Sequence, residues 1–240
     1  MKKNIVALEE IGLKVWTTDE PGFYIREYTD QAAAPDGQGV VDIPGKAVAN
    51  AAICIECFAM LERNDTPTHI EDRFSETELI VHKLTTLPLE VHCSNVAAGS
   101  LAQRLDAPDG QVLPIPVVEF LLKNEALNNP RYNYEHLSVA GNISEGEVKV
   151  LQARSIEINA LLKDFFMRRG IVLVDCALEF GRDQNNEINL GGDITPDTCK
   201  LWDRETHEKL DRDIFRRDLR GDELAYRTVM RRITGESDQK

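Results

Sequence analysis

The chain has 240 residues, and its 41 Asp and Glu outnumber its 28 Lys and Arg, so its formal net charge is −13. Because nucleic-acid affinity depends mostly on Lys and Arg that neutralise phosphates, this balance argues against a nucleic-acid partner. With 42% hydrophobic residues the chain can bury a core, whereas no window approaches the roughly 18 apolar residues of a membrane helix. Glu9 and Glu10 interrupt the first apolar run before it resembles a signal peptide, so a cytoplasmic location is expected.

The first 94 residues are expected to form short strands around one helix. The segments LKVWTT and GFYIREY flank the turn sequence DEPG, a strand–turn–strand signal, and a Pro- and Gly-rich loop begins at Ala32. In chain order the predicted elements are strands at 13–18 and 22–28, the loop from 32, a helix at 46–62, and a strand pair at 78–84 and 89–94.

The rest of the chain contains the clearest helix. A predicted strand in 114–133 runs into a polar loop, and then Ser144 and Glu147 form a capping box ahead of apolar residues at helical spacing, until Gly170 supplies the stop. A β-branched strand from Ile171, a short strand at 188–190 and a helix at 222–233 follow. This order indicates an α+β fold with two lobes, antiparallel sheets and a long amphipathic helix.

The cysteines do not indicate a disulfide framework or a metal site. There are five, an odd number, which favours reduced thiols. Cys54 and Cys57 form a C-x-x-C, but they lie in an alanine-rich helical pattern with no second pair to complete a tetrahedral site. We therefore expect both to be small core residues.

Two acids are candidates for binding a divalent cation. Glu179 and Asp193 lie on or beside paired strands near a Gly-Gly turn, and Mg²⁺ prefers carboxylate oxygens shared with substrate phosphates. The segment AAGSL at 97–101 offers small residues and a hydroxyl where a phosphate can approach the backbone. Neither glycine-rich nucleotide signature, G-x-x-x-x-G-K-[ST] or G-x-G-x-x-G, is present, and the five histidines show no metal-ligand spacing.

Five motifs in order, AAGSL followed by Arg104, FLLKNEALNNP, LVDCALEFG, LGGDITPD and KLWD, resemble the SAICAR synthetase family, the phosphoribosylaminoimidazole-succinocarboxamide synthases. The resemblance covers nearly the whole chain. It implies an N-terminal nucleotide-binding lobe at 1–87, a larger substrate- and metal-binding lobe at 88–240, and ATP bound between them. The implied reaction is ATP-dependent amide formation between a ribotide carboxylate and the amine of aspartate, through an acyl phosphate. A homodimer with small-molecule substrates and no membrane partner is expected.

The resemblance also implies roles for particular residues. Catalytic roles fall to Lys123, Asp175, Glu179 and Asp193, of which Glu179 and Asp193 would hold Mg²⁺. The implied ATP-binding residues are Gly12, Lys14, His82, Lys83, Leu84, Thr86 and Glu90. The implied substrate-binding residues are Ser94, Asn95, Gly99, Ser100, Arg104, Asn124, Glu125, Asn129, Asp197, Lys200 and Arg216, while Lys46 and Asn50 match the family at the start of the first helix.

Departures from the family pattern concentrate in the ribotide pocket. Ser94 and Val96 stand where the family has two arginines, and serine or valine cannot replace bidentate recognition by a guanidinium. Likewise Ala177, Gly192, Asn129 and Lys200 replace a lysine, an aspartate, an acid and an arginine, and Glu9 and Glu10 precede a shortened phosphate loop.

These departures lead to three hypotheses. The first is an amide ligase of this kind with an altered substrate in a specialised pathway. The second is an authentic SAICAR synthetase of purine biosynthesis. The third is a protein that has kept the fold and lost the use of ATP.

Overall fold

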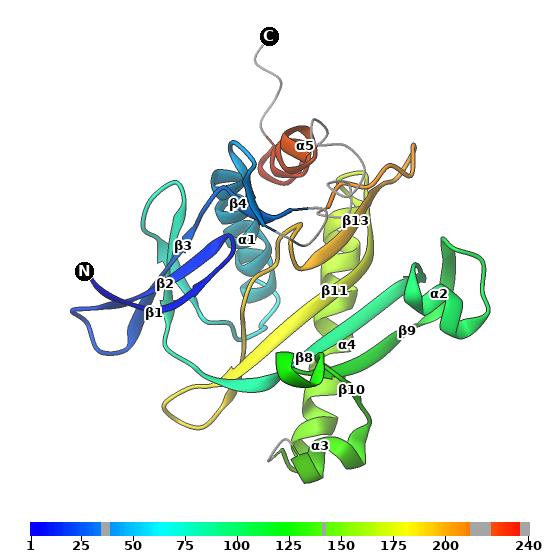
Figure 1. Cartoon of the computed structure of the whole chain (residues 1–240), viewed down its shortest axis with the longest axis horizontal. Coiled ribbons are helices and arrows are strands. Elements are labelled where there is room, and N and C mark those ends of the chain that lie inside the picture. The colour runs from blue at the N-terminus through cyan, green and yellow to red at the C-terminus, as the bar shows by residue number, and fades with distance from the viewer. Residues whose placement is uncertain (35–38, 141–142, 212–221, 236–240) are drawn as a thin grey trace.

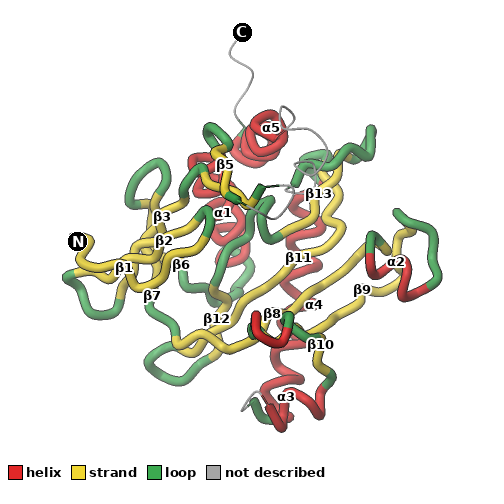
Figure 2. The backbone as a smooth tube through the Cα atoms, viewed as in Figure 1, coloured by secondary structure: helices red, strands yellow, loops and turns green. Residues whose placement is uncertain are grey.

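The computed structural model describes residues 1–34, 39–140, 143–211 and 222–235, and its two larger sheets lie next to each other with helices packed on them (Figure 1). Figure 2 shows the short strands of the first sheet near the N-terminus and the longer strands of the second sheet beside the long helix. Neighbouring strands in both sheets are antiparallel. The α+β class with antiparallel sheets, predicted from the sequence, is confirmed.

The first sheet has the strand order β1-β2-β3-β7-β6. Its strands are β1 (Lys3–Glu10), β2 (Leu13–Thr18), β3 (Phe23–Tyr28), β6 (Ile70–Arg73) and β7 (Glu78–His82). The sequence locates β2 and β3 within one residue. It does not reveal β1, because seven of the eight residues of that edge strand are exposed and no alternation marks a buried face.

The segment from Ala32, which is predicted to be a loop, takes part in a small hairpin. Strands β4 (Gln31–Ala33) and β5 (Val40–Asp42) pair with each other in register. Three-residue strands that alternate exposed and half-buried residues carry too little periodicity to be distinguished from a Pro- and Gly-rich loop.

Helix α1 (Lys46–Glu62) has the predicted bounds and packs against the first sheet, α4 and α5. Cys54 and Cys57 are both fully buried in it, as expected for core residues. All five cysteines are free and buried. Burial raises the pKa of the Cys54 thiol to about 12, so this thiol stays neutral inside the core.

The second sheet has the order β10-β9-β8-β11-β12, with β13 also paired to β11. Its strands are β8 (Thr85–Ala97), β9 (Gln111–Leu122), β10 (Arg131–Tyr132), β11 (Ile171–Arg182), β12 (Ile188–Gly191) and β13 (Cys199–Asp203). The expected pairing of β7 with β8 is wrong. β7 pairs with β3 and β6, and β8 pairs with β9 and β11, because the chain crosses from one sheet to the other between them.

Helix α4 (Glu145–Met167) covers one face of the second sheet. It begins at the predicted capping box, in which Ser144 and Glu147 bond each other's backbone. From β8, Cys93 reaches the Ser155 carbonyl of α4 and Asn95 bonds Asn159. Since alternate strand residues point to opposite faces, the even-numbered neighbours on β8 project from the other side, here called the open face.

The remaining described helices are short or peripheral. They are α2 (Ser100–Leu105), the 3-10 turn Glu125–Leu127, α3 (Tyr134–Ala140) and α5 (Asp222–Thr234), which packs on α1. No helix in the described ranges is both long and apolar enough to cross a membrane. The division into lobes at 1–87 and 88–240 remains a prediction, and its boundary falls within β8.

Candidate active site

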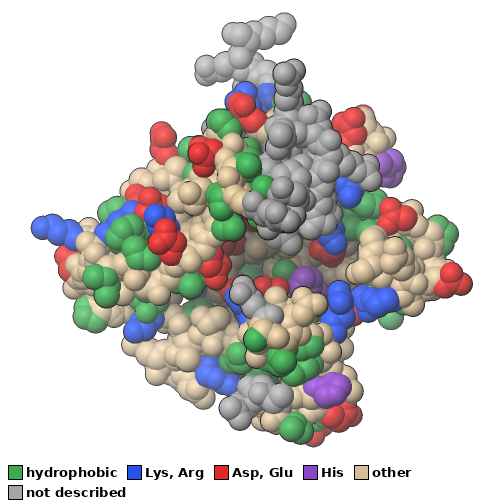
Figure 3. Space-filling view, in the orientation of Figure 1, with side chains coloured by type: hydrophobic (Ala, Val, Ile, Leu, Met, Phe, Trp, Pro, Cys, Tyr) green, Lys and Arg blue, Asp and Glu red, His purple; other side chains and the backbone are tan. Residues whose placement is uncertain are grey.

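Polar side chains gather on the open face of the second sheet. Cross-strand partners share a face, so the register defines three rows. The rows are Glu90 with Glu179, His92 with Glu119 and Ala177, and Ser94 with Val117 and Asp175. Figure 3 shows that the molecule is hollowed near the centre of this view and that acidic, basic and histidine side chains meet there.

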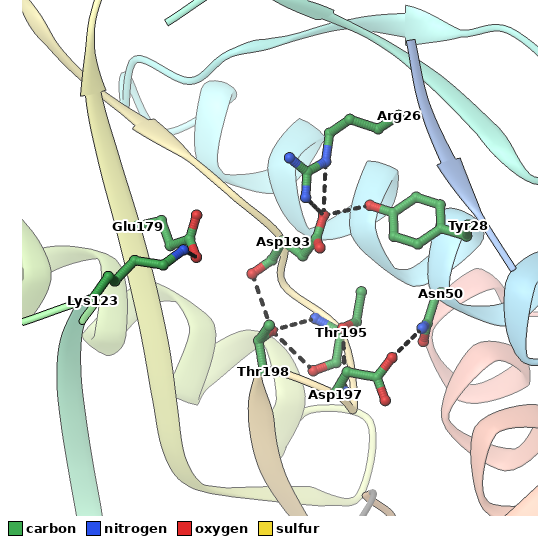
Figure 4. Close-up of polar contacts among 9 residues, drawn as sticks. All are labelled: Arg26, Tyr28, Asn50, Lys123, Glu179, Asp193, Thr195, Asp197 and Thr198. Atoms are coloured by element: carbon green, nitrogen blue, oxygen red, sulfur yellow. Dashed lines mark hydrogen bonds and ion pairs between the residues drawn. The ribbon is translucent and has the colours of Figure 1, made fainter. Parts of the chain in front are cut away.

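Glu179 is held by Lys123 at one end of these rows. The Lys123 ammonium lies 2.7 Å from Glu179 Oε1 (Figure 4). Partial burial disfavours the charge on the lysine, but the attraction and hydrogen bond of Glu179 outweigh it and raise the pKa of Lys123. The Glu179 side chain lies against Gly192, where a Cβ would come within 2.9 Å of the Glu179 Cβ and the backbone has φ +66°.

Asp193, one residue further on, is tied to the first sheet. Its Oδ1 accepts hydrogen bonds from the Tyr28 hydroxyl at 2.7 Å and from Arg26 at 2.8 and 3.1 Å (Figure 4). Burial first, and then the charge of Asp193, raise the pKa of Tyr28, so the phenol keeps its proton. Through these bonds β3 fixes the turn that follows β12.

Asp197 forms a second link between the two parts of the fold. One of its oxygens lies 2.7 Å from both the Lys46 ammonium and the Asn50 amide of α1, and the other accepts from the Tyr226 hydroxyl of α5 at 2.5 Å. Lys46 is only 2% exposed. The sequence-predicted residues Lys46, Asn50 and Asp197 therefore do come together, although 147 positions separate Asn50 from Asp197.

Two arginines converge on Glu119 beside His92. Arg104 makes a two-pronged contact with the Glu119 carboxylate, with both distances 2.6 Å, and Arg131 adds a third contact at 3.2 Å. Burial favours the neutral acid, yet the Arg104 hydrogen bond and charge outweigh it and lower the pKa of Glu119. In the next row, Lys200 pairs with Asp175 at 2.9 Å.

The predicted nucleotide residues near the N-terminus lie in the β1–β2 hairpin. Gly12 has φ +88° at the turn, and a Cβ there would lie 2.9 Å from the Lys46 ammonium, so this turn approaches the Asp197 cluster. Lys14 is paired with Glu9 at 2.8 Å, which raises the pKa of Lys14. The hairpin thus places Gly12 beside the Lys46 ammonium, while the ammonium of Lys14 is paired with Glu9.

The segment 82–86 crosses between the two sheets. His82 pairs with Glu71 at 2.8 Å, and the Lys83 ammonium lies over the Tyr24 ring. Leu84 packs so closely on Gly181 that a Cβ there would come within 2.7 Å of the Leu84 Cβ. Thr86 is the cross-strand neighbour of the same glycine. The four predicted residues therefore line one junction between the sheets.

One predicted substrate residue points away from the site. Asn95 donates to Asn159 at 2.8 Å and to the Leu173 carbonyl at 3.2 Å, both on the α4 side of the sheet. Strand alternation turns its side chain to the covered face, away from the other predicted residues, and its role in substrate binding stays a prediction. At the end of β8, the Gly99 amide donates to Asp109 and exposed Ser100 opens α2.

The loop after β9 holds the next predicted residues. The Asn124 amide donates to Asn129 Oδ1 at 2.8 Å, and the Leu127 amide donates to Asn124 Oδ1 at 3.2 Å. These side chains shape the loop that follows Lys123. The backbone of Glu125 begins the 3-10 turn, but its side chain and the whole of Arg216 lie outside the described residues.

The acids present fit a magnesium ion by their chemistry. Among the described residues, the contacts to the Asp193 carboxylate all end on Oδ1 and the Lys123 contact to Glu179 ends on Oε1, which leaves one oxygen of each carboxylate for another ligand. No group of three or more His, Cys, Asp or Glu in the described chain forms a metal cage by itself. Mg²⁺ is usually held by one or two carboxylates together with substrate phosphates, so both observations suit it.

Sequence reasoning missed several residues that shape the site. Arg26 and Tyr28 are two positions apart on β3, which puts them on one face, and this spacing was the available signal. No local pattern marks Glu119 or Tyr226. His69 is also unexpected: it is buried, it forms a hydrogen bond with the Gly192 backbone, and burial with the nearby Arg26 charge lowers its pKa to about 3.

The fold and the site define a class of protein. Two antiparallel sheets meet at a cluster of carboxylates and cations drawn from both of them, an arrangement suited to phosphate-bearing ligands with a divalent cation. The SAICAR synthetase family model matches residues 13–233.

Relatives and solved structures agree over nearly the full length. A phosphoribosylaminoimidazole-succinocarboxamide synthase of Coprothermobacter proteolyticus is 40% identical over 97% of this chain and 99% of its own length. One from Pyrococcus abyssi is 44% identical over 89% of this chain and 91% of its own. A solved SAICAR synthetase in complex with ADP has 41% identity and a TM-score of 0.90, covering 97% of this chain and 99% of that one. The chain belongs to the SAICAR synthetase family.

Proposed function

We propose that this chain catalyses the SAICAR synthetase reaction, in which ATP drives amide formation between the amine of aspartate and the carboxylate of a carboxylated aminoimidazole ribotide. The full-length relatives that carry this enzyme's name support the proposal. The similar solved structure that contains ADP supports an adenine nucleotide as a substrate. The prediction of an altered substrate in a specialised pathway finds no support in these relatives, and the second hypothesis takes its place.

The observation that carries the proposal is the Lys123–Glu179 pair beside Gly192 and Asp193. It places an ammonium within 2.7 Å of one carboxylate, next to the turn that presents a second. Phosphoryl transfer to a carboxylate accumulates negative charge, which a positioned cation offsets. Lys123 would stabilise that charge on the transferred group and the leaving phosphate.

Glu179 and Asp193 would hold Mg²⁺ through the oxygens that face away from Lys123 and Arg26. A bound Mg²⁺ supplies charge neutralisation and orients phosphate oxygens. Arg26 and Tyr28 keep Asp193 in place from the first sheet, so the metal-binding turn is fixed before any ligand arrives.

The ribotide side retains cations despite the lost arginines. Arg104 and Arg131 converge on Glu119, and Lys200 reaches the same open face through Asp175. Arg131 is not among the predicted substrate residues, and it lies on the neighbouring strand β10. We propose that these three cations, with Ser94 and Ser100, bind the anionic groups of the ribotide.

The remaining assignments belong to the same proposal. Gly12, Lys14 and the segment from His82 to Thr86 would contact ATP at the junction of the two sheets, with Glu90 nearby, and Asp197 would contact the organic substrates. Asn124, Glu125 and Asn129 would border the same site. A homodimer stays a prediction.

A direct assay tests the proposal. The purified protein, with ATP, Mg²⁺, aspartate and the carboxylated ribotide, should release ADP and phosphate in equal amounts with the amide product. Glu179→Gln should abolish product, whereas Glu145→Gln, an equal charge change on the exposed side of α4, should not. Thermal stabilisation by MgATP without product would favour the altered-substrate ligase. Neither stabilisation nor product would favour a protein that has lost ATP use.

A further inference from the structure

We infer that His92 accepts the proton that the amine substrate must lose before it attacks the activated carboxyl carbon. The inference rests on the proposed function, since it concerns the amine of that reaction. An α-amine is mostly an ammonium ion at neutral pH, and the ammonium has no lone pair with which to form the new bond. A base on the open face is therefore needed.

The position of His92 suits this role. It lies at the centre of the middle row of the open face, between Glu119 on β9 and Ala177 on β11. Its cross-strand neighbour Ala177 has only a methyl group, so no side chain from that position on β11 covers the imidazole. The side chain is 28% exposed, which allows a substrate to reach it.

The partner of His92 determines which ring nitrogen can act. Nε2 lies 3.1 Å from Glu90 Oε2, and an ionised carboxylate can only accept a hydrogen bond. Nε2 therefore carries the hydrogen, and Nδ1 keeps a lone pair that can take a proton. Glu90 would then stabilise the imidazolium that forms, as a carboxylate partner does for a catalytic histidine.

The other carboxylates on the rows next to His92 are already paired with cations. Glu179 faces Lys123, Glu119 faces Arg104 and Arg131, and Asp175 faces Lys200. The hydrogen bond and charge of Arg104 lower the pKa of Glu119, and each of the three carboxylates already has a cation as its partner.

The other described histidines lie in other parts of the structure. His69 is buried beneath the Gly192 turn, His82 pairs with Glu71, and His136 contacts Tyr132 beside α3. His207 lies in the turn after β13. Among the described residues, His92 is thus the imidazole that the open face offers.

The step balances in atoms and charge. Nδ1 of His92 takes one proton from the ammonium and becomes imidazolium, and the free amine forms a C–N bond with the acyl phosphate carbon. The C–O bond to phosphate breaks, and the second proton of the amine leaves with the phosphate as hydrogen phosphate. His92 then returns its proton to solvent.

A comparison of two amine substrates distinguishes a role of His92 in proton transfer from a structural role. Aspartate needs a base, whereas hydroxylamine is largely unprotonated at neutral pH and traps an acyl phosphate as a hydroxamate without one. His92→Gln should lower kcat/KM for aspartate by about 10²-fold, the usual contribution of general base catalysis. Its rate of hydroxamate formation with ATP and the ribotide should stay close to that of the unaltered protein. His136→Gln, an exposed histidine on α3, is the matched control and should change neither rate.

Chemical rescue provides the second measurement. In His92→Ala, added imidazole should restore part of the aspartate rate and leave the hydroxylamine rate unchanged. Equal loss with both amines, an unchanged aspartate rate, or no rescue of His92→Ala by imidazole would overturn the role of His92. If the unaltered protein forms neither amide nor hydroxamate, the proposed function fails first, and the two failures are thereby distinguished.

Discussion

The backbone of Gly192 passes directly beneath the side chain of Glu179: a Cβ on Gly192 would lie 2.9 Å from the Glu179 Cβ and 3.2 Å from its Oε2. Glu179 lies on β11 and pairs with Gly191, the last residue of β12, and Gly192 is the next residue along the chain. The position of one proposed metal-binding carboxylate therefore depends on the absence of a side chain at 192.

Gly192→Ala should both destabilise the protein and displace Glu179. The left-handed backbone at φ +66° costs an L-residue about 1–2 kcal/mol, and the close contact adds to it. Urea unfolding measures the first effect and MgATP titration the second. Gly146→Ala, in the first turn of α4 with open space around it, is the control and should stabilise by about 0.5–1 kcal/mol. Unchanged MgATP affinity in Gly192→Ala would contradict the dependence of Glu179 on this glycine.

Lys123→Met should reduce turnover strongly with little loss of stability. The lysine is 37% exposed, so its ion pair contributes little to the stability of the fold, but it supplies the positive charge next to Glu179. Loss of one positioned charge stabiliser typically lowers kcat by about 10²-fold or more. Steady-state rates of amide formation check this, with Lys149→Met on exposed α4 as the matched variant. A kcat equal to that of the unaltered chain would exclude the role proposed for Lys123.

Asp193→Asn should unfold more easily because it leaves the Arg26 guanidinium without its carboxylate. Both side chains are largely buried, at 12% and 14% exposure, and breaking such a pair costs about 3 kcal/mol. The double variant Arg26→Met with Asp193→Asn should recover part of this loss, because no charge then remains buried. Chemical denaturation of Asp193→Asn, Arg26→Met and the double variant gives the coupling energy. Additive losses would show that the pair is not coupled.

Stability in acid should depend on Asp203. Its carboxylate accepts backbone hydrogen bonds from Thr206 and Glu205 and pairs with Arg232 of α5 at 2.6 Å, which together hold its pKa well below the ordinary value. A depressed pKa contributes stability above the ordinary aspartate pKa, and this contribution is lost as the pH falls further through the folded-state value.

Asp203→Asn should therefore lower the unfolding free energy at neutral pH by about 2 kcal/mol, the scale of hydrogen bonds to a charged group. The difference from the unaltered protein should shrink below about pH 4. Denaturation at a series of pH values checks this. Asp164→Asn removes an exposed pair with Arg168 and should shift stability by less than about 1 kcal/mol at any pH. A pH-independent difference would contradict the assignment to Asp203.

The sequence by itself determined those features whose causes are local. The capping box of Ser144 and Glu147 and the following apolar spacing locate α4, and the alanine-rich run locates α1 and buries Cys54. The five ordered motifs determine the family. Two of these motifs contain the candidates Lys123 and Glu179, whose side chains lie within hydrogen-bonding distance of each other.

Only the tertiary structure decided which of the candidates meet and what holds them. The Asn95 side chain lies on the α4 face because of strand alternation, and β7 and β8 belong to different sheets. Arg26 bonds Asp193, although 167 positions separate them. Such contacts depend on how the two sheets dock, and docking is set by the sum of many packing interactions rather than by any short segment. For the same reason the place of His92 among the paired charges of the open face becomes visible only when β8, β9 and β11 lie side by side.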